Sequence, residues 1–226
     1  DTAAFVVPGR ESNQINGSLT VTTPTYQHFT VSATVSAGDT PIFREAAPGR
    51  AMTATSGSGF CLRTEGLGLA GMTETPIVVV EGQRPGPAIG LPTRTEQGDL
   101  QFVLYAHQGD FPRAVLAPAT IEDCFWLTIK AFNLAEKYQI PVIVMTDHVL
   151  ATSYFTVEKF DISKVAIDRG SLLSDEEANE PEYKRYQITP SGISPRAFPG
   201  QGKSLVVADS DEHDEECRIV TYFYES

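Results

Sequence analysis

Short apolar runs recur along the middle of the chain, and turn-forming residues bound each of them. Runs of this kind are typical of strands that are buried on both faces of a sheet. The pattern predicts four such strands, at Arg50–Thr55, Ile77–Val80, Arg113–Leu116 and Pro141–Thr146.

Two helical patterns lie between these strands. The first, Phe60–Thr73, is rich in glycine. The second runs from Thr120 to Tyr138, with Thr120 as N-cap and Asp123 at the capping-box position. Its apolar residues recur at helical spacing, which places them on one face. They are Ile121, Phe125, Ile129 and Phe132.

This alternation of strand and helix predicts an α/β fold. Its sheet is doubly wound and mainly parallel, with helices on both faces. We assign this domain to residues 46–162. Residues 1–45 form a separate irregular or β segment with strand-like alternation at Leu19–Thr23 and Phe29–Val35. Residues 163–226 are polar and acidic, and we predict an extended linker and the start of a C-terminal region, with Ser204–Asp209 as a further possible strand.

Charge and hydropathy argue against nucleic-acid-binding and membrane-spanning proteins. The 226 residues carry a formal net charge of −12, and no basic stripe is visible, so we expect no nucleic-acid partner. No stretch approaches the roughly 20 apolar residues that cross a bilayer, so we expect no membrane partner. The acidic runs Asp175–Glu182 and Asp209–Glu216 are interpreted as solvated segments. His213, inside the second run, matches no metal-site spacing, and we predict no metal ligands.

The three cysteines are scattered, which fits a reducing cytoplasm. Cys61 and Cys124 lie in apolar helical patterns and are predicted to be small core residues. An iron–sulfur cluster takes four thiolates or a close substitute, so we expect this chain to ligate none.

In parallel sheets of this kind, ligands bind beyond the carboxyl ends of the strands. Three loops leave those ends: Ser56–Gly59, Gly82–Asp99 and Asp147–Ser153. We therefore place the chemistry in these loops.

Two features of the loops stand out. Thr55–Gly59 (TSGSG) precedes a helix whose N-terminus favours an anion or a polar ring edge, although a purely structural turn explains it equally well. Arg84 follows a buried strand and enters a loop stiffened by proline and glycine. An arginine there can hold a carboxylate through parallel hydrogen bonds, or it can be a surface arginine that pairs with a glutamate.

A longer combination of motifs resembles a known family. TSG, GLAGMTE, QRPGPxxGLPT and TEQGDL follow one another between Arg50 and Leu104, and FPRAVLAP, FNLAEKYQIPVIVMTD and YFTVEKFD continue the likeness to Asp161. It resumes in residues 192–216. In these segments the chain resembles the α subunit of 2-oxoacid:ferredoxin oxidoreductases, of the 2-oxoglutarate and 2-oxoacid type.

The resemblance implies a pyrimidine-type thiamine diphosphate domain over residues 46–162. It implies that thiamine diphosphate is shared with a β subunit, which brings Mg²⁺ and a 4Fe–4S cluster. The implied reaction turns a 2-oxoacid, coenzyme A and oxidised ferredoxin into acyl-CoA, carbon dioxide and reduced ferredoxin. Arg84 matches the residue that binds the substrate carboxylate, and Thr55, Ser56 and Gly57 match the loop near the cofactor.

The sequence departs from the family in two places. The Gly-Tyr-Pro-x-Thr-Pro-Ser segment that meets the substrate is absent. The glutamate that activates thiamine has Glu45 as its one candidate, and few residues separate Glu45 from Arg50. A scaffold subunit with a degenerate pyrimidine-type domain therefore stands as the alternative to a catalytic subunit.

Overall fold

The structure, a computed structural model, describes residues 19–22, 30–33, 50–198, 201, 208 and 210–220. Its main sheet has four parallel strands in the order β3-β4-β6-β5. They are β3 (Ala51–Ser56), β4 (Ile77–Gln83), β5 (Ala114–Leu116) and β6 (Pro141–Asp147). All four predicted strands are thus confirmed, and the paired β1 (Leu19–Thr22) and β2 (Thr30–Ala33) lie within the two segments of predicted alternation.

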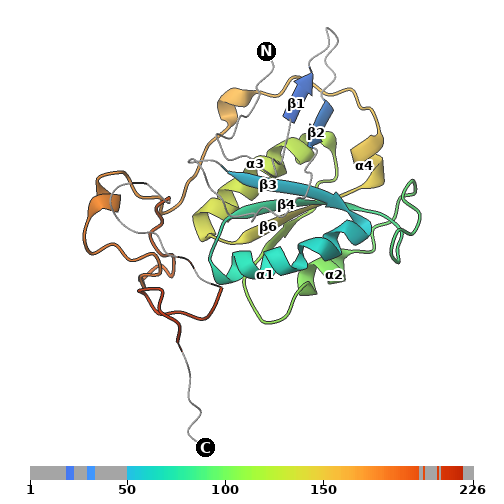
Figure 1. The fold of residues 1–226 in the computed structure, drawn as a ribbon. Coiled ribbons are helices and arrows are strands. Elements are labelled where there is room, and N and C mark those ends of the chain that lie inside the picture. The colour runs from blue at the N-terminus through green and yellow to red at the C-terminus, as the bar shows by residue number, and fades with distance from the viewer. Residues whose placement is uncertain are drawn as a thin grey trace, which may run out of the picture.

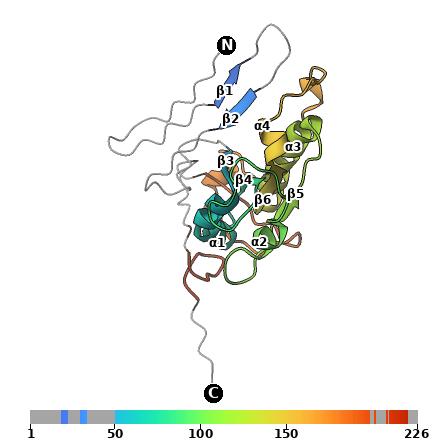
Figure 2. The same cartoon turned by 90° about the vertical axis from the view of Figure 1, so that its right-hand side faces the viewer.

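Helices cover both faces of this sheet, as predicted. Helix α3 (Ile121–Tyr138) lies on one face, and the 3-10 helix η1 (Gly57–Arg63), α1 (Thr64–Met72) and α2 (Leu100–Tyr105) lie on the other (Figure 1). Figure 2 shows the sheet between the two layers from the side.

The core divides in the same way because successive residues of a strand point to opposite faces. Ile77 and Val79 of β4 pack with Phe60, Leu67 and Val103 beneath the first layer. Val78 belongs to a second cluster, which it shares with Ala131, Ala135, Val142 and Val144. Strands β4 and β6 therefore bury both faces, which explains their continuous apolar runs.

Helix α3 begins with the predicted capping box. The Thr120 side chain accepts a hydrogen bond from the Asp123 backbone, and Asp123 accepts one from Thr120 in return. The predicted apolar face of α3 is only partly confirmed. Its four residues are half-buried rather than buried: Ile121, Phe125, Ile129 and Phe132. Small residues of the next stripe, Ala131 and Ala135, make the closest contact with the sheet.

Other expectations were wrong or incomplete. Cys61 is exposed rather than buried, because η1 turns it away from the sheet, while Cys124 is half-buried. Helices α2 and α4 (His148–Thr152) were not predicted, since each spans only one or two turns and shows no periodic repeat.

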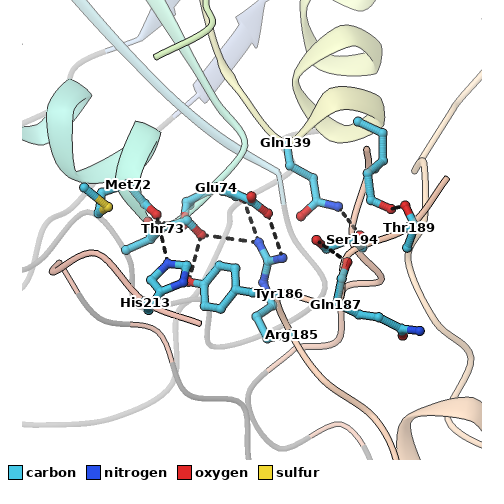
Figure 3. A network of polar contacts seen from close by, with 12 residues as sticks. Met72, Thr73, Glu74, Gln139, Arg185, Tyr186, Gln187, Thr189, Ser194 and His213 are labelled. Carbon is cyan, nitrogen blue, oxygen red and sulfur yellow. Dashed lines mark hydrogen bonds and ion pairs between the residues drawn. The ribbon is translucent and has the colours of Figure 1, made fainter. Parts of the chain in front are cut away.

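The segment after β6 has little regular structure beyond η2 (Ile162–Lys164) and η3 (Glu177–Asn179). It nevertheless packs against the domain. Arg185 donates to the carbonyl groups of Thr73 and Glu74, and Tyr186 also donates to Thr73 (Figure 3). The acidic run Asp175–Glu182 is exposed apart from Ala178, as predicted. Most of Ser204–Asp209 lies outside the described residues.

Among the described residues, no helix combines the length and the apolar character that a membrane span needs.

Candidate functional site

Strands β3, β4 and β6 end at the same edge of the sheet. Ser56 lies beside Gly82 in the register, and Gln83 lies beside Asp147. The three loops predicted to carry the chemistry therefore leave the sheet together. The loop after β4, residues 84–99, extends well beyond that edge (Figure 1).

Arg84 lies against Gly57 at this edge. Gly57 has a φ of +52°, and a Cβ atom built on it would lie 2.5 Å from Nε of Arg84. The position therefore requires glycine, both for its left-handed backbone and for the space it leaves. Nε of Arg84 is buried and has no hydrogen-bond partner among the described residues. The half-buried Arg84 thus reaches the loop after β3 without pairing with a protein carboxylate there.

Two hydrogen bonds hold the end of the long loop against the sheet. The Gln97 side chain donates to Oδ2 of Asp147 (2.8 Å), and the backbone N–H of Asp99 donates to Oε1 of Gln83 (3.3 Å). Asp147 also caps α4 by accepting from the Leu150 N–H (2.9 Å). That backbone bond, followed by the Gln97 bond, lowers the pKa of Asp147 despite its burial. Asp147 is therefore an ionised structural residue of this edge.

Glu81 is the residue of the site that the sequence did not reveal. The predicted strand ends at Val80, and the predicted loop begins at Gly82, but β4 continues to Gln83. Glu81 is 0% exposed, and neither carboxyl oxygen has a hydrogen-bond partner among the described residues. Burial, and then the nearby charge of Asp99, raise the pKa of Glu81 to about 8. Its one sequence signal was a charged residue directly after four apolar ones.

The predicted residues Thr55, Ser56, Gly57 and Arg84 therefore meet at one edge. Glu45 lies outside the described residues.

His148 and His213 make contacts that are structural in character. His148 begins α4 and contacts Thr152 (3.3 Å), and His213 stacks on Tyr186 with ring centroids 3.7 Å apart. In the part of the chain that the structure describes, no three His, Cys, Asp or Glu side chains form a group that could hold a metal ion.

Comparison with known proteins gives consistent matches. Residues 45–225 match the family model described as pyruvate flavodoxin/ferredoxin oxidoreductase, thiamine diphosphate-binding. The chain is 48% identical over 172 residues to 2-oxoacid:ferredoxin oxidoreductase 1, subunit alpha, of Sulfurisphaera tokodaii, covering 75% of this chain and 27% of that one. It is 41% identical over 166 residues to 2-oxoglutarate synthase subunit KorA of Methanothermobacter thermautotrophicus, covering 74% and 43% of the two chains.

A solved structure is similar as well. It is the 2-oxoglutarate:ferredoxin oxidoreductase from Magnetococcus marinus with 2-oxoglutarate, coenzyme A and succinyl-CoA bound. The TM-score is 0.72 at 40% identity, over 77% of this chain and 30% of that one. The chain thus spans about a quarter of the length of the first curated relatives it matches.

Proposed function

Because the chain belongs to the thiamine diphosphate-binding family of pyruvate flavodoxin/ferredoxin oxidoreductases, we propose that it forms part of the α subunit of a 2-oxoacid:ferredoxin oxidoreductase. The enzyme converts a 2-oxoacid, coenzyme A and oxidised ferredoxin into acyl-CoA, carbon dioxide and reduced ferredoxin. The observation that carries the proposal is Arg84, whose unpartnered guanidinium nitrogen lies against Gly57 at the carboxyl edge of a parallel sheet.

Arg84 is the residue that binds the substrate. A guanidinium can donate parallel hydrogen bonds to a carboxylate, and it does so with most effect where water is excluded. Because Arg84 forms no ion pair with a described carboxylate, its charge is available for the anion. Bound in this way, the oxoacid would have its carboxylate fixed and its keto carbon directed across the loop after β3.

The edge also suits the cofactor. Buried polar atoms without partners are typical of sites that a ligand completes, and here they include Nε of Arg84 and Oδ2 of Asp99. We assign Thr55, Ser56 and Gly57 to the wall beside the pyrimidine ring of thiamine diphosphate. When bound, thiamine diphosphate supplies the electron sink for decarboxylation. The residues of this chain position the substrate and exclude water.

A partner subunit completes the enzyme in this proposal. We place Mg²⁺ and a 4Fe–4S cluster on a β subunit, because such a cluster takes four thiolates and this chain has three scattered cysteines. The long loop exposes Ile89 and Leu91, as expected of a surface that another polypeptide covers. Ferredoxin then accepts the electrons in the cytoplasm.

The catalytic assignment is favoured over a scaffold subunit by the relatives. The similar proteins bear the names of oxidoreductase and synthase subunits. The position of Arg84, the one residue that the resemblance assigned to the substrate, supports the same choice, because its side chain lies against Gly57 of the loop after β3.

The test is Arg84→Ala in the assembled enzyme. The apparent affinity for the 2-oxoacid should fall about ten- to a hundredfold, because a charge-assisted hydrogen bond contributes about 1.5–3 kcal/mol. Thiamine diphosphate binding should be unchanged. Arg94→Ala is the matched control, since Arg94 is an exposed arginine of the same loop. Equal 2-oxoacid affinities for the two variants would remove Arg84 from the substrate site.

A further inference from the structure

Glu81 occupies an unusual position for a carboxyl group. It lies in β4 between Thr55 of β3 and Met145 of β6 in the sheet register. By the alternation of the strand it shares a face with Ile77 and Val79, which belong to the apolar cluster around Phe60. The side chain is completely buried within this chain alone, so an added subunit cannot expose it.

Few polar groups compensate for this burial. The N–H of Gly57 approaches the carboxyl group and favours its charged form, but no well-formed hydrogen bond reaches either oxygen among the described residues. An isolated buried carboxylate is costly, and such groups usually take up a proton instead. By contrast, Asp147 on the neighbouring strand has two hydrogen-bond donors.

Two charged groups act on Glu81 with opposite signs. Asp99 disfavours a second negative charge, and Arg84 favours one, but burial and Asp99 dominate and the pKa rises to about 8. The elements packed against β4 also carry Arg63 in η1, Asp147 at the end of β6 and His148 in α4. None of these three is a cause of the Glu81 shift.

We propose that Glu81 is a positioning residue, held as a neutral carboxylic acid so that the positive charge of Arg84 remains available for the 2-oxoacid carboxylate. The inference rests on the proposed function. No ion pair joins Glu81 to Arg84 in the structure, although the two residues are three positions apart. An ionised Glu81 would compete with the substrate for the same guanidinium in a region of low dielectric constant.

This role gives 2-oxoacid binding a defined pH dependence. Below about pH 8 Glu81 is neutral, and the substrate meets the full charge of Arg84. Above that pH Glu81 ionises, and the incoming anion raises its pKa again. Binding must then take up as much as one proton, and affinity falls by up to about tenfold per pH unit.

The experiment compares wild type with Glu81→Gln, which keeps the shape and the neutral charge. The probes are lactate and 2-hydroxyglutarate, which carry the carboxylate of a small and a large 2-oxoacid without its keto carbon. Calorimetric titration of the assembled enzyme between about pH 6.5 and pH 9.5, in buffers of different ionisation enthalpy, gives both affinity and proton uptake around the pKa of about 8. Wild type should lose affinity and take up a proton at high pH. Glu81→Gln should bind with wild-type affinity near neutral pH and show neither effect.

Asp99→Asn provides a second variant, which also covers the case in which Glu81→Gln fails to fold. Removing the Asp99 charge lowers the pKa of Glu81, so the loss of affinity should begin at lower pH. A pH profile and proton uptake that are the same in wild type and in a folded variant would overturn the role of Glu81.

Arg84→Ala distinguishes a failure of the proposed function from a failure of the Glu81 role alone. If it binds the probe like wild type, the proposed function fails. If it weakens binding while the pH profiles do not differ, the role of Glu81 fails by itself.

Discussion

At the scale of single residues, the contact between Gly57 and Arg84 determines where the guanidinium lies. A Cβ atom at position 57 would overlap the Arg84 side chain, with atoms 2.5, 2.8 and 3.1 Å away. These distances are below ordinary contact distances, so one of the two groups must move. The orientation of Arg84 therefore depends on the absence of a side chain at position 57.

Gly57→Ala should consequently weaken 2-oxoacid binding by about tenfold or more, because a shift of about 1 Å in a positioning group is costly. Gly109→Ala is the control, since Gly109 also has a positive φ (+74°) but open space around it. Both variants should lose about 1–2 kcal/mol of stability through the left-handed backbone. Titration with 2-oxoacid and thermal unfolding distinguish the two effects, and equal binding by both variants would contradict the assigned contact.

At the scale of elements, a buried ion-pair cluster fastens the segment after β6 to α3. Glu136 of α3 is 2% exposed, and it pairs with Arg169 (3.2 Å) and with Arg196, which is 4% exposed. The polar composition of this segment predicted a linker, because sequence alone does not show which charges become buried against a helix. The contact is tertiary, and it joins residues 60 positions apart.

Glu136→Ala should lower the free energy of unfolding by about 3–5 kcal/mol, since it removes the carboxylate of a buried ion pair. Glu122→Ala, at an exposed position of the same helix, should change it by about 0.5 kcal/mol or less. Chemical denaturation measures both values, and limited proteolysis should show earlier cleavage in residues 163–198 of Glu136→Ala. Similar stabilities would mean that the segment is held elsewhere.

At the scale of the whole molecule, the sequence predicted those features of the fold and site that depend on local sequence patterns. Four strands, the capping box of α3 and the gathering of Arg84 with Thr55–Gly57 follow from apolar runs, turn residues and the rule for parallel sheets. Glu81 could not be found in this way, because its importance comes from burial in a sheet whose flanking strands place Thr55 and Met145, both distant in sequence, beside it. The same holds for Cys61, whose exposure depends on how η1 turns.

We propose that this edge of the sheet holds a 2-oxoacid through Arg84 beside thiamine diphosphate. The decisive measurement is a structure of the assembled enzyme with its 2-oxoacid bound. We predict that both substrate carboxylate oxygens accept hydrogen bonds from the Arg84 guanidinium, with the keto carbon toward the cofactor and Glu81 forming no ion pair. A substrate carboxylate held by another residue, with Arg84 turned toward solvent, would contradict the assignment.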